Sequence, residues 1–234
     1  MIESEGVQKR VRRQVRSPRS AALAGILFSL LMAASMILLR SGAIVDTAEI
    51  GTEWLESRSA AASVVLVLVP FAGIAFLWFT GVMRDLLGDR EDKFFATVFL
   101  GSGIILVVMM FVWAAAYGAI FGTYKAIADV LTDLDVFVYA ISFTNQIISN
   151  YFLRMAGVYM LSTGSLWTRT RAVPRWLSII TFIVALSFLL FAGALRLARF
   201  IFPAWVLLVS VYILILNYRY TQELEGDEEP TLDV

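Results

Sequence analysis

Three polar residues recur at a spacing of four in an otherwise apolar part of the sequence: Gln146, Asn150 and Arg154. Residues four apart lie one turn above each other on the same face of an α-helix. Arg154 is also the one charged residue between Asp135 and Arg169. Because an arginine is effectively never neutralised, a membrane segment that contains one must supply it with polar or anionic partners. We therefore expect any ligand chemistry of this protein to centre on this face.

Two neighbouring side chains extend the polar face, so that the predicted ligand-binding set is Arg154, Asn150, Gln146, Asn145 and Tyr151. Amide and hydroxyl groups are suitable hydrogen-bond partners for a guanidinium or for a polar ligand beside it. No carboxylate partner is expected, because all 19 Asp and Glu fall in predicted loops and tails. The main chemical question that the sequence poses is therefore what satisfies Arg154.

Three interpretations of Arg154 stay open. In the first interpretation, its guanidinium either reaches the lipid headgroups or joins a structural polar network between helices. In the second interpretation it binds an anionic or polar ligand in a cavity within the bundle. In the third it contacts a partner membrane subunit. The second interpretation predicts that Arg154→Leu abolishes ligand binding and leaves the protein folded.

The elements that position these residues are predicted from blocks of apolar residues. Hydrophobic residues make up 59% of the 234 residues and charged residues 16%. In soluble domains, apolar residues make up about 45–50% and charged residues about 25%. A helix needs about 20 apolar residues to cross a bilayer. The sequence therefore predicts an all-α polytopic membrane protein, a bundle of six transmembrane helices within one domain over 21–219. The predicted spans are about 21–39, 60–83, 94–117, 137–166, 176–195 and 200–218.

The segments between and beyond the spans are polar. We expect a basic arm over 1–20, an acidic tail over 220–234, and short amphipathic surface helices within 40–59 and 125–135. Pro70 removes a backbone hydrogen bond inside the second span, which predicts a kink there.

Charge predicts the orientation. With six spans, one side of the membrane carries thirteen Lys and Arg: six in the arm, three in 84–93, three in 169–175, and Arg219. The other side carries five, and Arg154 lies within a span. Cytoplasmic loops of membrane proteins are enriched in Lys and Arg, so both termini are predicted to be cytoplasmic.

Missing residue types exclude several classes of function. The chain has no cysteine and no histidine, which argues against disulfides, His-ligated haem and most zinc sites. No paired carboxylates fall in predicted spans, and no phosphate-binding or hydrolase motif is present. We therefore predict no catalytic residues, no metal and no cofactor. An intramembrane enzyme is the least favoured function, and no nucleic-acid partner is expected.

Two features indicate partners in and on the membrane. The basic arm is predicted to contact anionic lipids of the bilayer, which attract each Lys or Arg by about 1 kcal/mol near the surface. Ala114, Gly118 and Gly122 form a ridge of small residues that lets another helix approach closely. This ridge predicts packing within the chain, in a homo-oligomer, or in a larger membrane complex.

Two stretches carry a resemblance: RDLLGDREDKFFATVFLGSG (84–103) and PAWVLLVSVYIL (203–214). They resemble segments of small six-helix bacterial integral membrane proteins without an assigned activity. The resemblance implies a location in the bacterial inner membrane and no functional residues.

The function predicted from the residues is binding or permeation of a small polar or anionic ligand, or of a lipid, within the bundle. The alternative is an accessory or assembly subunit of a larger membrane complex.

Overall fold

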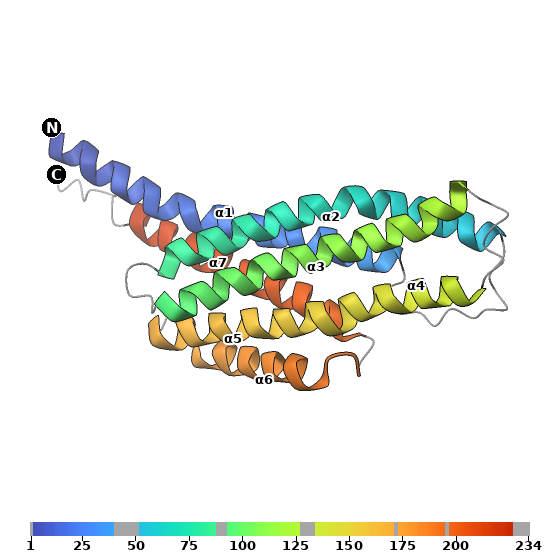
Figure 1. The fold of residues 1–234 in the computed structure, drawn as a ribbon. Helices are drawn as coiled ribbons and strands as arrows, with labels where there is room; N and C mark the ends of the chain where they lie inside the picture. Colours follow the sequence, from blue (N-terminus) through green and yellow to red (C-terminus); the bar gives the residue numbers. More distant parts are fainter. Residues whose placement is uncertain are drawn as a thin grey trace, which may run out of the picture.

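The computed structural model describes residues 2–39, 52–87, 93–126, 134–170, 173–194 and 197–226, and these are almost entirely helical (Figure 1). The elements are α1 (Ile2–Leu38), α2 (Thr52–Leu87), α3 (Lys93–Ala126), α4 (Leu134–Gln146), the π-helix η3 (Ile147–Phe152), α5 (Leu153–Thr170), α6 (Arg175–Phe191) and α7 (Ala198–Gly226). Since α4, η3 and α5 follow each other without a break, they form one continuous rod.

Four of the helices are long and apolar enough to cross a membrane. Their apolar parts are Arg19–Leu38, Glu56–Arg84, Ala96–Thr123 and Ala198–Tyr218. The apolar helix α6 is shorter, with 17 residues. The prediction of an all-α protein is thus confirmed, and so is its coarser part that several helices are long and apolar enough to span a membrane.

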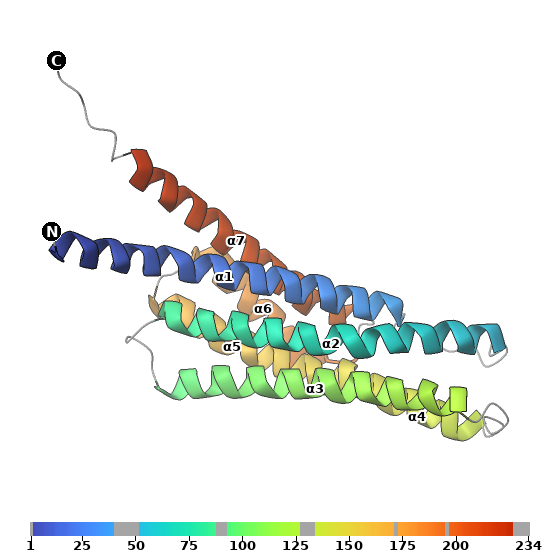
Figure 2. The same ribbon diagram turned by 90° about the horizontal axis from the view of Figure 1, so that it is seen from above.

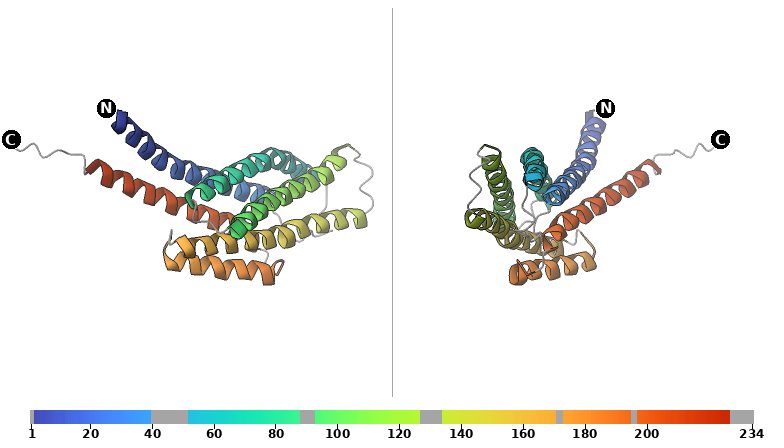
Figure 3. Two further views of the ribbon diagram at one scale, coloured as in Figure 1. Left: turned by 60° about the vertical axis from the view of Figure 1, so that its left-hand side comes forward. Right: turned by 90° about the vertical axis from the view of Figure 1, so that its right-hand side faces the viewer.

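The helices pack in a curved row whose order differs from the order in the sequence. α7 lies against α1, α1 against α2, α2 against α3, α3 against the rod, and α5 against α6. Figure 2 shows α1, α2 and α3 side by side, and Figure 3 shows α1 and α7 diverging from the bundle toward their free ends. The start of α1 and the end of α7 lie at the same end of the bundle (Figure 1).

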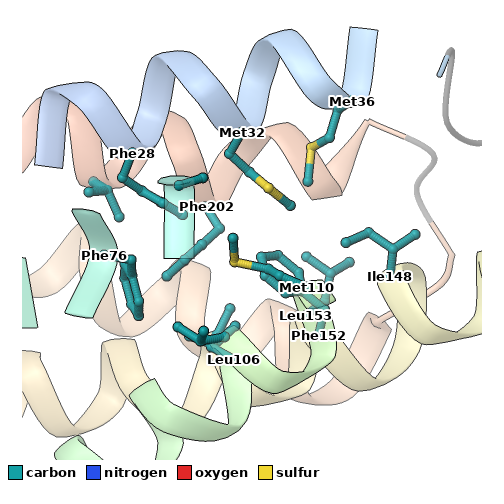
Figure 4. Packing of buried hydrophobic residues seen from close by; sticks show 14 of the residues in the cluster. Phe28, Met32, Met36, Phe76, Leu106, Met110, Ile148, Phe152, Leu153 and Phe202 are labelled. Atoms are coloured by element: carbon teal, nitrogen blue, oxygen red, sulfur yellow. The ribbon is translucent and has the colours of Figure 1, made fainter. Parts of the chain in front are cut away.

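Aromatic side chains fill the core where the curved row closes between α7 and the rod. Phe76 of α2 lies 4.8 Å from Phe28 of α1 and 5.7 Å from Phe202 of α7, measured between ring centroids. Phe99 of α3 stacks on Tyr159 of α5 at 4.7 Å. Figure 4 shows Met32, Met110 and Ile148 continuing this core along the helices, away from Phe28 and Phe76. Such rings bury about 150–250 Å² each and dominate the packing of the chains that carry them.

Several helices extend beyond the predicted segments. α1 begins at Ile2 and so includes the predicted arm, and α2 begins at Thr52, within the predicted surface helix 40–59. α2 also continues through Pro70 as one helix. The parts 40–51 and 127–133 of the predicted surface helices, and the end of the acidic tail from 227, lie outside the described residues.

Candidate functional site

The predicted polar face lies where the rod changes from α-helix to π-helix. In η3 the backbone hydrogen bonds join residues five apart instead of four, which widens the turn. Such π segments are rare and frequently occur at functional sites. Gln146 lies directly before η3, Asn150 lies within it, and Arg154 is the second residue of α5, which follows it. The local distortion is therefore centred on the three residues that the sequence singled out.

The structure brings these three side chains together in a hydrogen-bonded chain. Arg154 Nη1 donates to Asn150 Oδ1 at 3.2 Å, and Asn150 Nδ2 donates to Gln146 Oε1. Each amide oxygen thus accepts one hydrogen bond from the next residue along the rod. This arrangement holds the half-buried guanidinium of Arg154 in a fixed direction along the helix surface.

The turn between α6 and α7 covers the middle of this chain. Gly193 has φ +85°, and a Cβ at this position would lie 2.8 Å from Asn150 Oδ1. Only glycine adopts this backbone conformation without steric cost, and only its lack of a side chain admits the amide so closely. About two turns farther along the rod than Asn150, Gly157 faces α6, since a Cβ there would lie 2.9 Å from the carbonyl oxygen of Ala185. The polar face of the rod is therefore directed toward α6 and the turn that follows it.

The other two predicted site residues lie elsewhere on the rod. The side chain of Tyr151 is 61% exposed and points away from the packed interior. Asn145 is partly buried, and its Oδ1 atom is buried without a hydrogen-bond partner among the described residues. The structure thus unites Gln146, Asn150 and Arg154, and places Asn145 and Tyr151 outside their hydrogen-bonded chain.

The stretch around the site contains only positive charge. Between Asp135 and Glu223 the sequence has seven arginines and neither an Asp nor a Glu. In the described parts of the chain, Arg154 has no carboxylate partner, and its hydrogen bond is to the neutral amide of Asn150. Arg199, in the first turn of α7, is also buried, with 3% of its surface exposed. The chemistry of this region therefore suits an anion or a strongly polar acceptor.

Three side-chain hydrogen bonds join helices at different levels of the bundle, and sequence reasoning did not identify these pairs. Thr80 Oγ1 and Tyr159 Oη lie 3.0 Å apart and join α2 to α5. Trp205 Nε1 donates to Thr181 Oγ1 at 2.9 Å and joins α7 to α6. Arg19 Nε donates to Asn217 Oδ1 at 2.7 Å and joins α1 to α7. Polar residues inside predicted spans were the available signal, but their pairing depends on the packing of distant helices.

The ridge of small residues divides between two environments. A Cβ on Gly118 would lie 2.6 Å from Leu66 Cδ1, so this glycine admits the side chain of α2 within the same chain. Ala114 is buried, whereas Gly122 faces open space.

Comparison with known proteins gives no relative from which a role could be transferred: no protein-family model, curated protein or solved structure matches the chain.

Proposed function

We propose that this chain is a six-span membrane protein with cytoplasmic termini that binds a small anionic or polar group beside Arg154. A lipid phosphate is one such group. The observation that carries the proposal is the hydrogen-bonded chain of Gln146, Asn150 and Arg154 on a π-helix, without a carboxylate partner in the described residues.

Three uncharged segments agree in length and define the thickness of the proposed bilayer. They are the stretches 20–39, 176–195 and 200–218 of the sequence, which comprise 20, 20 and 19 residues and include the apolar parts of α1, α6 and α7. Within the second stretch, α6 itself ends at Phe191. Each matches the roughly 20 residues that a hydrocarbon core of about 30 Å requires. The uncharged segments of α2 and α3, over 59–83 and 94–124, are longer, and so is the segment 136–168 of the rod, whose one charged residue is Arg154. In this arrangement these three elements project beyond the bilayer on the side opposite the termini, here called the outer side.

Arg154 then lies close to the outer edge of the hydrocarbon. It is 15 residues from Arg169, at the inner end of α5. At about 1.5 Å per residue this is about 22 Å, or about 8 Å below the outer edge of a 30 Å core. Long arginine side chains extend over such distances to the interface. A ligand or lipid headgroup from the outer side is therefore within reach of its remaining donors.

The geometry of the guanidinium selects the class of ligand. Arginine has five N–H donors in a planar fork that matches a carboxylate or phosphate in a bidentate manner. One donor of Arg154 contacts Asn150, which fixes the fork and leaves further donors for the ligand. Since pre-organised donors lose less entropy on binding, the amide chain raises the affinity for such an anion.

Retention of an anionic lipid tests the proposal. We would reconstitute the wild type and Arg154→Leu with mixtures of phosphatidylglycerol and phosphatidylcholine, and count retained lipids by native mass spectrometry. Loss of a hydrogen-bonded charge costs about 1.5–3 kcal/mol, so the tightest phosphatidylglycerol should bind about tenfold to a hundredfold more weakly. Arg169→Leu removes the same charge at the inner end and should keep this lipid.

The folded state of Arg154→Leu is verified by circular dichroism and size-exclusion chromatography in detergent. If the folded variant retains phosphatidylglycerol as tightly as the wild type, Arg154 does not bind the anion and the proposal fails.

A second candidate function is an accessory subunit of a larger membrane complex. The outer part of α4 carries an apolar face that no described residue covers, with Val136, Tyr139 and Phe143 exposed by 62%, 72% and 53%. Exposed apolar faces of this kind commonly mark interaction sites. A stoichiometric membrane protein that co-purifies with the wild type, and is lost when Tyr139 and Phe143 are changed to serine, would favour this function.

A further inference from the structure

Two buried polar atoms in the interface between α3 and the rod lack hydrogen-bond partners among the described residues: Trp113 Nε1 and Asn145 Oδ1. The Trp113 side chain is completely buried. One atom is an obligate donor and the other an acceptor. Leaving either atom unpaired in an apolar environment is destabilising, so such atoms in a stable protein require a partner.

The packing register of α3 against the rod places the two residues at the same level. Phe121 of α3 contacts Phe137 of α4, with ring centroids 6.4 Å apart. Steps of four residues down α3 lead from Phe121 through Tyr117 to Trp113, which are linked ring to ring at 6.2 and 5.7 Å. The same two steps along α4 lead from Phe137 to Asn145.

The register holds at the other end of the interface. Phe99 stacks on Tyr159, 14 residues from Trp113 along α3 and 14 residues from Asn145 along the rod. Residues four apart share one face of a helix, so both stripes face each other over this length. The unpaired donor and the unpaired acceptor therefore lie opposite each other in an otherwise apolar contact.

We propose that Trp113 and Asn145 form a second binding site, which holds one hydroxyl group between α3 and α4. A hydroxyl accepts a hydrogen bond and donates another, so it accepts the indole N–H of Trp113 and donates to Oδ1 of Asn145. The hydroxyl belongs either to a water molecule or to a small ligand. This site is separate from the proposed anion site, which lies on the face of the rod directed toward α6.

The test follows the indole N–H of Trp113 by NMR. Protein with ¹⁵N-labelled tryptophan in deuterated detergent gives one indole signal per tryptophan, and Trp113→Phe assigns the signal of interest. We expect a cross-peak from this N–H to the hydroxyl guest in the wild type, and its loss together with a shift of the indole signal in Asn145→Leu. Asn145→Ala is the second variant in case the leucine side chain prevents folding.

The source of the hydroxyl is distinguished by two arms of the same experiment. A cross-peak at the water resonance, with no retained mass in native mass spectrometry, identifies water. A retained mass that disappears in Asn145→Leu identifies a ligand hydroxyl. Either result supports the site.

Two results would overturn the proposal. One is a direct contact between the indole N–H and the amide of Asn145 without a guest signal. The other is an indole signal that is identical in the wild type and in both Asn145 variants. Neither result bears on the anion site, because Arg154 is unchanged in all these proteins.

Discussion

Gly25 of α1 lies at a close contact with α7, and this contact makes a sharp prediction. A Cβ on Gly25 of α1 would overlap with Oγ of Ser210 in α7 and lie 2.8 Å from Cδ2 of Phe79 in α2. Phe79 and Ser210 are both buried, so they have little room to move away. We therefore expect Gly25→Ala to force α1 away from α7 and to destabilise the fold.

The magnitude follows from two opposing terms. Alanine is favoured over glycine within a helix by about 1 kcal/mol, whereas overpacking a well-packed core costs about 1–3 kcal/mol. Gly101→Ala is the matched control, because a Cβ there meets nothing within 4 Å. The helix term is common to both variants, so Gly25→Ala should be less stable than Gly101→Ala by about 1–3 kcal/mol.

The assay is equilibrium unfolding in mixed micelles with increasing SDS, followed by circular dichroism. Ser210→Ala removes the overlapping oxygen, which has no hydrogen-bond partner among the described residues. The double variant of Gly25 and Ser210 should therefore recover part of the lost stability. Equal unfolding midpoints for Gly25→Ala and Gly101→Ala would refute the close approach of α1 and α7.

Three further predictions concern contacts between distant segments. Thr80→Val leaves the buried hydroxyl of Tyr159 unpaired and should lower the free energy of unfolding by about 1–3 kcal/mol in the same assay. The double variant with Tyr159→Phe should lower it by less. Trp205→Phe removes the hydrogen bond to Thr181 and should lower the free energy of unfolding by about 1 kcal/mol or more, the excess reflecting the smaller ring. Gly193→Ala combines a strained positive φ with a close contact to the side-chain amide of Asn150, so the free energy of unfolding should fall by about 1–2 kcal/mol. An unchanged unfolding midpoint would contradict this turn geometry.

The polar chain could be anticipated because it depends on local geometry. Gln146, Asn150 and Arg154 are four residues apart, and their hydrogen bonds run along one helix surface. The spacing alone therefore predicts their proximity whichever helices pack nearby. The widened turn of η3 could not be predicted in the same way, since no residue type signals a change in backbone hydrogen bonding.

The ends of the helices were harder to predict than their presence. The predicted spans follow the apolar residues, but α3 continues to Ala126, nine residues beyond the predicted end at 117. Apolar length reports the thickness of a membrane, whereas a helix ends where its backbone hydrogen bonds end. The sequence contains no Pro between Pro70 and Pro174 to stop α3.

Pairs that join distant helices were beyond sequence reasoning. The hydroxyl of Tyr159 in α5 lies against Thr80 of α2, a residue 79 positions away in the sequence. Gly25 and Ser210 are separated by 185 positions, and nothing in either local sequence indicates their contact. Such contacts follow from the order in which helices pack, here α7 beside α1, and composition carries no information on that order.

The π-helix η3 accommodates one extra residue without changing the angular phase between the two halves of the rod. A π-helix turns by about 80° per residue, against about 100° in an α-helix, so the six residues of η3 turn the rod about as far as five α-helical residues would. Removing one residue other than Asn150 from Ile147–Phe152 to restore α-helical geometry would therefore keep Asn145 directed toward Trp113. The same deletion would reduce a spacing of four in the polar chain to three, either between Gln146 and Asn150 or between Asn150 and Arg154. The extra residue of η3 thus sets the spacing of the polar chain that faces α6, while the donor–acceptor pair that faces α3 keeps its direction.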